Sequence, residues 1–212
     1  MVRYPASHTV RQVALYERLA LPDVPEMAAL IALGANLPNG ENPPEATLKS
    51  ALDALADRGI SVCSVSRLYA TPCFPAGSGP DYVNAAAAIL VPAGLTADDI
   101  LAHLLAVEME FGRERKRRWG MRTLDLDLVA WGDRVLPDRP GFDRWRNLDP
   151  ALQAQAAPDR LILPHPRLQD RAFVLVPLAD IAPAWCHPVL GLTVSQMLAA
   201  LPEADRRAVV PL

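Results

Sequence analysis

Residues 123–131 read Thr-Leu-Asp-Leu-Asp-Leu-Val-Ala-Trp, and polar and apolar side chains alternate over the first six positions. Successive side chains of a β-strand point to opposite sides of the sheet, so the three leucines would share one face. Asp125 and Asp127 would share the other face, about 6.5–7 Å apart. The stretch predicts a half-exposed strand that presents two carboxylates to one site.

The segments before this strand alternate between strand-like and helix-like patterns. Helices are expected where leucines recur at helical spacing between recognisable start and stop residues. Strands are expected where apolar and β-branched residues form short runs between turn residues. The expected order is a strand at 28–33, a helix at 45–58, strands at 60–70 and 82–91, a helix capped by Thr96 and Asp99 that ends near Gly112, and the strand at 123–131.

This βαββαβ order predicts an α+β fold of the ferredoxin-like type, an antiparallel sheet with two helices on one face and the other face open to ligands. Residues 1–27 would be an N-terminal extension, and 28–212 a single domain. Residues 132–160 hold several prolines and no long period, which indicates a surface insertion. The C-terminal additions would be a short strand, a proline-rich stretch and a helix at 193–201.

The composition limits the possible partners. The 212-residue chain is 51% hydrophobic and 21% charged, and its formal net charge of -3 argues against a broad nucleic-acid or membrane surface. No stretch reaches the roughly 18 apolar residues of a membrane span. The three cysteines are odd in number and scattered, which favours a reducing compartment. We therefore expect a cytoplasmic monomer that acts on small molecules, with no nucleic acid and no membrane.

A basic segment directly precedes the two aspartates, with six Lys and Arg residues from Arg113 to Arg122. Arginine binds phosphate oxygens in bidentate fashion, and magnesium shares carboxylate oxygens with substrate phosphates. The combination favours metal-dependent phosphoryl transfer, although no Walker-type loop is present. Taken singly, the aspartates would also fit a solvated strand face, and the basic run a solvated loop or a nucleic-acid patch.

Two further positions could contact a ligand. His165 stands between two prolines that restrict its backbone, so it could donate to a phosphate or serve a structural role. Tyr82 and Asn84 would share one face of their strand and offer an aromatic plane beside an amide. That pair would suit a flat heterocycle, or it could belong to the core.

These residues together form a pattern that resembles the 6-hydroxymethyl-7,8-dihydropterin pyrophosphokinase family. The resemblance covers about residues 29–200. The matching motifs are Leu-Gly-Ala-Asn-Leu at 33–37, Thr-Pro at 71–72, Pro-Asp-Tyr-Val-Asn-Ala at 80–85, Gly-Arg at 112–113, Trp-Gly at 119–120, Arg-Thr-Leu-Asp-Leu-Asp-Leu at 122–128, Leu-Pro-His-Pro at 163–166 and Arg-Ala-Phe at 171–173.

The resemblance implies a ferredoxin-like domain that binds ATP with two Mg²⁺ ions and transfers the β,γ-diphosphate of ATP to the hydroxymethyl group of the pterin. It implies that Asp125 and Asp127 ligate the metal. The implied pterin contacts are Asn84 at the ring edge, Tyr82 and Phe173 on the two ring faces, and Thr71 and Pro72 around the pocket. The implied ATP contacts are His165, Arg171, Arg115 and Arg118, and the implied closing loop carries Arg113, Trp119 and Arg122.

Three other readings remain open from the residues alone. An RNA-binding module could share this fold, although the sequence lacks the paired aromatic pattern of such proteins. Another phosphoryl or nucleotidyl transferase could use the same aspartate pair. An inactive relative could serve as an interaction protein.

Overall fold

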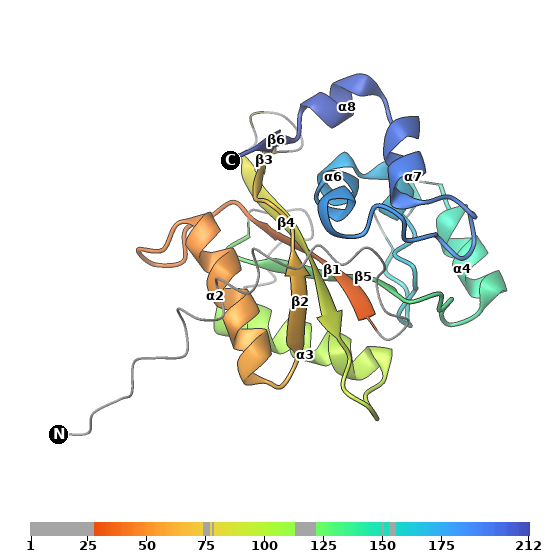
Figure 1. Cartoon of the computed structure of the whole chain (residues 1–212), viewed down its shortest axis with the longest axis horizontal. Helices are drawn as coiled ribbons and strands as arrows, with labels where there is room; N and C mark the ends of the chain where they lie inside the picture. Colours follow the sequence, from red (N-terminus) through yellow and green to blue (C-terminus); the bar gives the residue numbers. More distant parts are fainter. Residues whose placement is uncertain (1–27, 74–76, 78, 113–121, 150, 153–155) are drawn as a thin grey trace.

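The structure is a computed structural model (Figure 1), and it describes residues 28–73, 77, 79–112, 122–149, 151–152 and 156–212. The extension expected at 1–27 and most of the expected closing loop lie outside the described residues.

An antiparallel sheet forms the centre of the described structure. Its strands are β1 (Ala28–Ala35), β2 (Ser61–Val65), β3 (Tyr69–Thr71), β4 (Tyr82–Leu90), β5 (Asp125–Trp131) and β6 (Val210–Pro211). The strand order is β5-β1-β4-β3-β6, and β2 also pairs with β4. The α+β class and the antiparallel sheet are therefore confirmed. The ferredoxin-like type stays a prediction for the βαββαβ part, because the sheet also contains β3 and β6.

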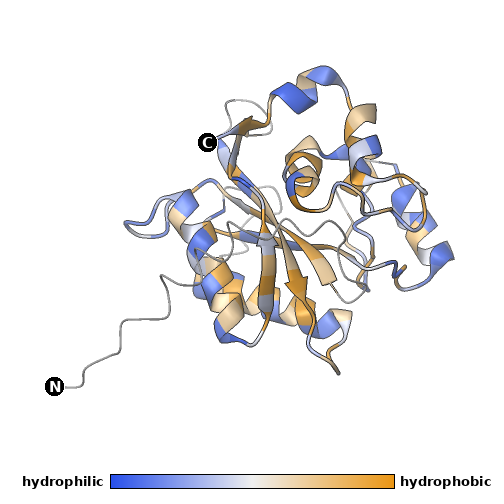
Figure 2. Cartoon of the chain, viewed as in Figure 1, coloured by the Kyte–Doolittle hydropathy of each residue, from blue (hydrophilic) through white to orange (hydrophobic). Residues whose placement is uncertain are grey.

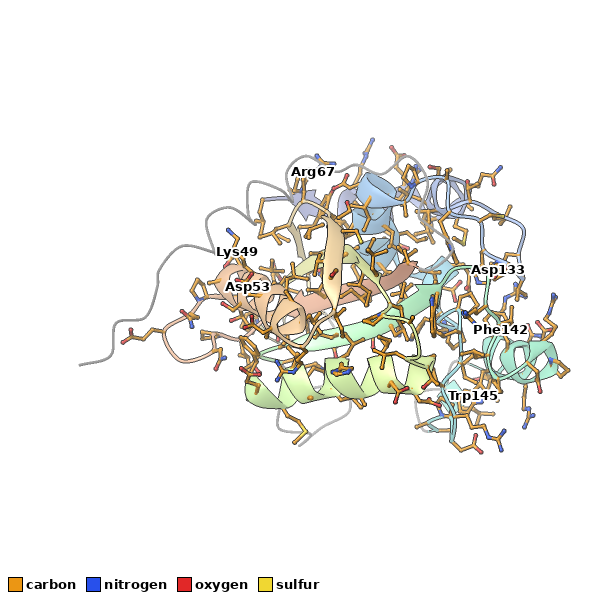
Figure 3. The ribbon with its side chains drawn as sticks, turned by 60° about the horizontal axis from the view of Figure 1, so that its bottom comes forward. Lys49, Asp53, Arg67, Asp133, Phe142 and Trp145 are labelled. Atoms are coloured by element: carbon orange, nitrogen blue, oxygen red, sulfur yellow. The ribbon has the colours of Figure 1, made fainter. Side chains whose placement is uncertain are left out.

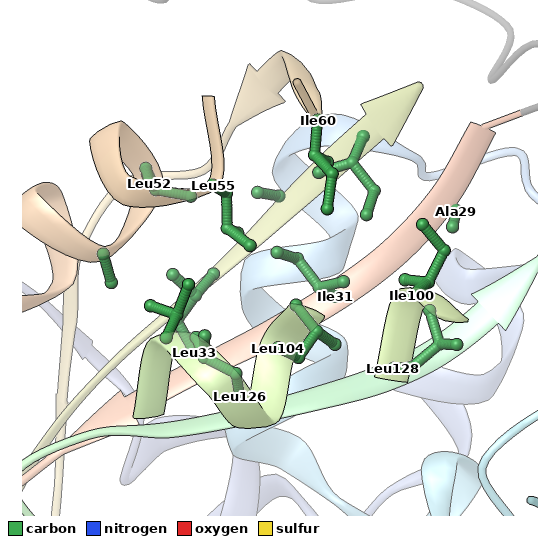
Figure 4. Packing of buried hydrophobic residues seen from close by; sticks show 14 of the residues in the cluster. Ala29, Ile31, Leu33, Leu52, Leu55, Ile60, Ile100, Leu104, Leu126 and Leu128 are labelled. Atoms are coloured by element: carbon green, nitrogen blue, oxygen red, sulfur yellow. The ribbon is translucent and has the colours of Figure 1, made fainter. Parts of the chain in front are cut away.

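Helices α2 (Pro44–Asp57) and α3 (Ala97–Glu110) cover one face of the sheet, as expected. Their leucines pack against alternate residues of β1 and β5, such as Ile31 and Leu126 (Figure 4). Full burial of a side chain of this size contributes about 1.5–3 kcal/mol. The predicted cap of α3 is confirmed: Thr96 Oγ1 accepts from the Asp99 amide, and Asp99 accepts from the Thr96 amide.

The expectation that the second face is open was wrong. Helices α6 (Ala172–Ile181) and α7 (Val194–Ala200) pack on it and form a second core over Leu30, Ala86 and Ala88. Figure 2 shows the apolar strands between the two helical layers, with polar residues toward the outside. In the described part of the chain, helices therefore cover much of this face as well.

Several elements differ from the prediction. The strand expected at 60–70 is divided into β2 and β3. Between them, Ser66 Oγ accepts a hydrogen bond from the Ala86 amide, in place of the backbone carbonyl that would accept it in a continuous strand.

The insertion and the C-terminal part also differ from the prediction. The insertion contains α4 (Arg139–Arg146), which is held by the fully buried Phe142. The short strand expected after residue 160 is a single bridge, Leu136 to Leu163. Two elements not predicted close the chain, α8 (Glu203–Arg207) and β6.

Helix α6 was not predicted either. All of its residues except Asp180 are apolar, so they show no helical stripe, and Pro177 lies inside it. A proline normally argues against a helix interior, but here the surrounding side chains are buried. The helix expected at 193–201 is confirmed as α7, with a capping box between Thr193 and Gln196.

Candidate active site

The two predicted carboxylates lie on the face of β5 that α6 leaves uncovered. Asp125 is opposite Gly34 in β1, and Asp127 is opposite Ala32, so both point to the same side. Leu126 between them is buried under α3. The Asp125 side chain is 24% exposed and that of Asp127 44% exposed, so the core holds the strand while the acids reach solvent.

Two arginines from different segments pair with these acids. Arg122 Nη1 contacts Asp125 Oδ1, and Arg171 Nη1 lies 3.8 Å from Asp127 Oδ2. Burial acts to lower the pKa of Arg122, but Asp125 and Asp127 outweigh it and the pKa ends above its usual value. Burial lowers the pKa of Arg171, and Asp127 opposes that shift. Positive and negative groups are thus concentrated at one end of the sheet.

His165 is positioned beside Asp127 by its own backbone. Its amide donates to the Val129 carbonyl at 2.7 Å, and its Nδ1 accepts from the Arg167 amide at 3.1 Å. A neutral imidazole carries one proton, so that proton is on Nε2. Burial, with Arg171 and Arg167 nearby, lowers the pKa of His165 to about 3. His165 therefore offers an N–H donor without a charge, in a pocket that it lines with Asp127 and Arg171.

The predicted Tyr82–Asn84 pair lies across the sheet from Asp125. Asn84 is opposite Gly34 in β1, and Gly34 is in turn opposite Asp125 in β5, so the three residues form a row on one face. Asn84 Nδ2 donates to Thr71 Oγ1 at 2.6 Å. Burial raises the pKa of the Tyr82 phenol, while Arg122 and Asp125 shift it in opposite directions. The amide and the ring therefore lie within electrostatic reach of the acidic end.

Two of the remaining predicted residues, Pro72 and Phe173, are exposed at the edge of the candidate site. Pro72 is exposed and directly follows β3. Phe173 is 41% exposed on α6, and the Arg171 guanidinium lies over its ring at 5.7 Å from the centroid. Arg113, Arg115, Arg118 and Trp119 lie outside the described residues.

Asn36 and Gly34 have no predicted role, although both belong to the Leu-Gly-Ala-Asn-Leu motif at 33–37. Asn36 is 3% exposed and binds the backbone of Arg122 and of Pro80. A Cβ on Gly34 would lie 3.0 Å from Asn84 Oδ1. No spacing rule could reveal either contact, because the partners come from segments far apart in the chain.

Within the part of the chain that the structure describes, no three His, Cys, Asp or Glu side chains gather as a metal cluster, and no helix is long and apolar enough to cross a membrane. The chemistry available at this site is therefore an acid pair with arginines, a neutral imidazole and an amide beside an aromatic ring.

Known proteins resemble this chain over most of its length. A family model described as 7,8-dihydro-6-hydroxymethylpterin-pyrophosphokinase (HPPK) matches residues 30–183. The 2-amino-4-hydroxy-6-hydroxymethyldihydropteridine pyrophosphokinase of Synechocystis sp. is 38% identical over 184 residues, which are 86% of this chain and 79% of that protein. The enzyme of the same name from Pseudomonas aeruginosa is 37% identical over 81% of this chain and 90% of its own length.

Solved structures share the fold at low sequence identity. The wild-type HPPK-DHPS of Plasmodium falciparum has a TM-score of 0.56 and 12% identity, and it covers 81% of this chain. The same protein with SDX-DHP has a TM-score of 0.57. This chain spans 44% of the length of each of these two chains. The chain thus belongs to the 7,8-dihydro-6-hydroxymethylpterin-pyrophosphokinase family, and it transfers a pyrophosphoryl group from ATP to hydroxymethyldihydropterin in folate synthesis.

Proposed function

We propose that Asp125 and Asp127 hold the divalent metal of the reaction, expected as two Mg²⁺ ions, together with the phosphates of ATP. Their chemistry fits, because magnesium takes few protein oxygens and completes its shell with water and phosphate. Both carboxylates are partly exposed on one face of β5. Metal bound there would neutralise the charge of the transferring phosphates.

The row Asn84–Gly34–Asp125 supports this assignment most strongly. Neighbouring strands lie about 4.8 Å apart, so the Asn84 and Asp125 backbones are separated by about 10 Å. That distance suits a pterin at Asn84 whose hydroxymethyl group extends over Gly34 toward phosphates at the acids. The two reactants would thus be held side by side, which is the main source of acceleration in phosphoryl transfer.

The pterin would be recognised by Asn84 and stacked by aromatic rings. Because Asn84 Nδ2 donates to Thr71, the amide has a fixed orientation and its Oδ1 is directed to accept from the ring edge. Tyr82 and Phe173 would cover the two faces of the ring, with Pro72 at the rim. Phe173 is 41% exposed, so its ring is accessible to a stacking partner.

The ATP phosphates would be bound by Arg171 and His165, while Arg122 would stabilise the transferring group. The pterin hydroxyl oxygen would attack the β-phosphorus and lose its proton to water, while the bond from the β-phosphorus to the bridging oxygen breaks and AMP leaves with that oxygen. His165 would donate through Nε2 without adding a charge that the arginines would repel. We propose Arg113, Arg115, Arg118 and Trp119 as further substrate contacts from the family resemblance alone.

We also propose that 28–212 acts as one unit, with its insertion at 132–160, and that the protein is a cytoplasmic monomer without a nucleic-acid partner. The net charge of -3 and the scattered cysteines support these proposals.

Replacement of Asp127 tests the metal assignment. We expect Asp127→Ala to lower kcat at least about a hundredfold, because it removes half of the acid pair. The variant should stay folded, since the side chain is 44% exposed. Asp133→Ala is the matched control, because Asp133 follows the same strand at an exposed turn (Figure 3). Equal activity of both variants would remove Asp127 from the metal site.

A further inference from the structure

The Asn36 side chain links the two segments that flank the candidate site. It directly follows β1, and its carboxamide contacts residues 86 positions ahead and 44 positions ahead in the chain. We propose that Asn36 is a positioning residue for the transfer: it fixes the segment of Arg122 relative to the segment that leads into Tyr82. This proposal rests on the substrate sites proposed above.

The first arm of the link holds the backbone of Arg122. Asn36 Oδ1 accepts from the Arg122 amide at 2.8 Å. The Arg122 carbonyl accepts from the amides of Asn36 and Leu37 at 3.0 and 3.1 Å. Both backbone groups of Arg122 are therefore bound to the end of β1. The Arg122 guanidinium, which pairs with Asp125, is aimed from a fixed base.

The second arm holds the entrance to β4. Asn36 Nδ2 donates to the Pro80 carbonyl at 3.1 Å. Pro80 stands two residues before Tyr82, the first residue of β4. Tyr82 and Asn84 form the proposed pterin site, so this bond sets where that site begins relative to β1.

Asn36 is suited to both arms at once because a carboxamide carries an acceptor and a donor. The side chain is 3% exposed, and leaving buried polar groups without a partner costs about 1–3 kcal/mol each. Both bonds should therefore persist in solution. Aspartate at this position would keep the acceptor for Arg122 and lose the donor for Pro80, which makes the arms separable.

The test compares Asn36→Ala and Asn36→Asp in the full chain, with steady-state kinetics for ATP and for 6-hydroxymethyl-7,8-dihydropterin. Asn36→Ala should lower kcat roughly tenfold to a hundredfold and raise KM for the pterin, because displacements of about 1 Å have effects of this size. Asn36→Asp should raise KM for the pterin with a smaller change in kcat. A purely structural role would lower the melting temperature of both variants without this division between kcat and KM.

Asn39→Ala is the matched control, because it removes the same type of side chain from the same segment between β1 and α2. The hydrogen bonds of Asn39 are made by its backbone. Its kinetics should equal those of the unaltered chain. The proposal is overturned if folded Asn36→Asp keeps both KM values and kcat within about twofold. Arg122→Ala and Asn84→Ala, measured in the same assay, separate the role of Asn36 from the proposed substrate sites. If these two variants also keep normal kinetics, the proposed substrate sites are wrong. If they are impaired while the Asn36 variants are not, only the role of Asn36 is refuted.

Discussion

Gly34 is the residue at which the proposed pterin site and the acidic end of the sheet meet. Its neighbours across the sheet are Asn84 and Asp125, and the absence of a side chain leaves the space between them. A Cβ would lie 3.0 Å from Asn84 Oδ1 and 3.8 Å from Tyr82 Cδ1. Glycine is therefore required here by close approach rather than by an unusual backbone angle.

We predict that Gly34→Ala raises KM for the pterin roughly tenfold with little loss of stability. The added methyl would displace the Asn84 amide from its place beside Thr71. Steady-state kinetics in the unaltered and in the Asn84→Ala background form a double-mutant cycle. The effect of Gly34→Ala should be smaller once Asn84 is absent; equal effects in both backgrounds would show that Asn84 is not involved.

The sequence predicted which side chains share a face wherever the residues belong to one strand. Asp125 and Asp127 share a face because of strand alternation, and so do Tyr82 and Asn84. The contact between Asn84 and Thr71 could not be predicted, because it depends on the register between two strands. The contacts of Asn36 could not be predicted for the same reason, because its partners belong to distant segments of the chain.

Among the elements, β3 and α6 are joined by one carboxylate. Tyr69 Oη donates to Asp180 Oδ2 at 2.7 Å, and Arg67, labelled in Figure 3, donates to both oxygens of the same group. Burial, with Asp180 beside it, raises the pKa of Tyr69 to about 12. Because α6 carries Phe173, this link orients one wall of the proposed pterin pocket.

We predict that Tyr69→Phe lowers the free energy of unfolding by about 1.5 kcal/mol, because it removes a partly buried hydrogen bond to a charged group. Arg67→Ala should have a smaller effect, since the Arg67 side chain is 66% exposed and such pairs contribute little. Urea unfolding of both variants measures the difference. A larger loss for Arg67→Ala would contradict this account of the link.

Some helices could be predicted from their own residues, and others could not. Helices α2, α3 and α7 have periodic apolar residues or caps of their own, and all three were predicted. Helix α6 has no such pattern and folds because one side of it, with Val174, Leu175 and Leu178, is buried in the second core. Its prediction would have required the tertiary structure, and so would the prediction that it packs on the second face of the sheet.

In the molecule as a whole, His187 joins the C-terminal part to the insertion. It is fully buried, its Nδ1 accepts from the amides of Val189 and Leu190, and its ring packs at 5.6 Å from that of Phe142 in α4. Burial, with Arg146 and Arg139 nearby, lowers the pKa of His187 to about 4. His187 is therefore neutral in the folded protein at neutral pH.

This burial predicts a loss of stability in acid. The unfolded chain binds a proton near pH 6.5 and the folded chain only near pH 4, so the free energy of unfolding should fall as the pH falls through this window and level off below it. The expected contribution is about 3 kcal/mol, because one pKa unit corresponds to about 1.4 kcal/mol. Unfolding of His187→Gln at pH 7 and pH 4 should show a smaller decrease than that of the unaltered chain. An equal decrease would show that His187 does not titrate as described.

We propose that the acid pair of β5 directs a pyrophosphoryl group, and not a single phosphoryl group, from ATP to the pterin. The most direct test of this proposal is chromatography of the nucleotide product after incubation of the protein with ATP, Mg²⁺ and 6-hydroxymethyl-7,8-dihydropterin, with and without EDTA. AMP should form only when pterin and metal are both present. Formation of ADP, or of AMP without the metal, would contradict the account.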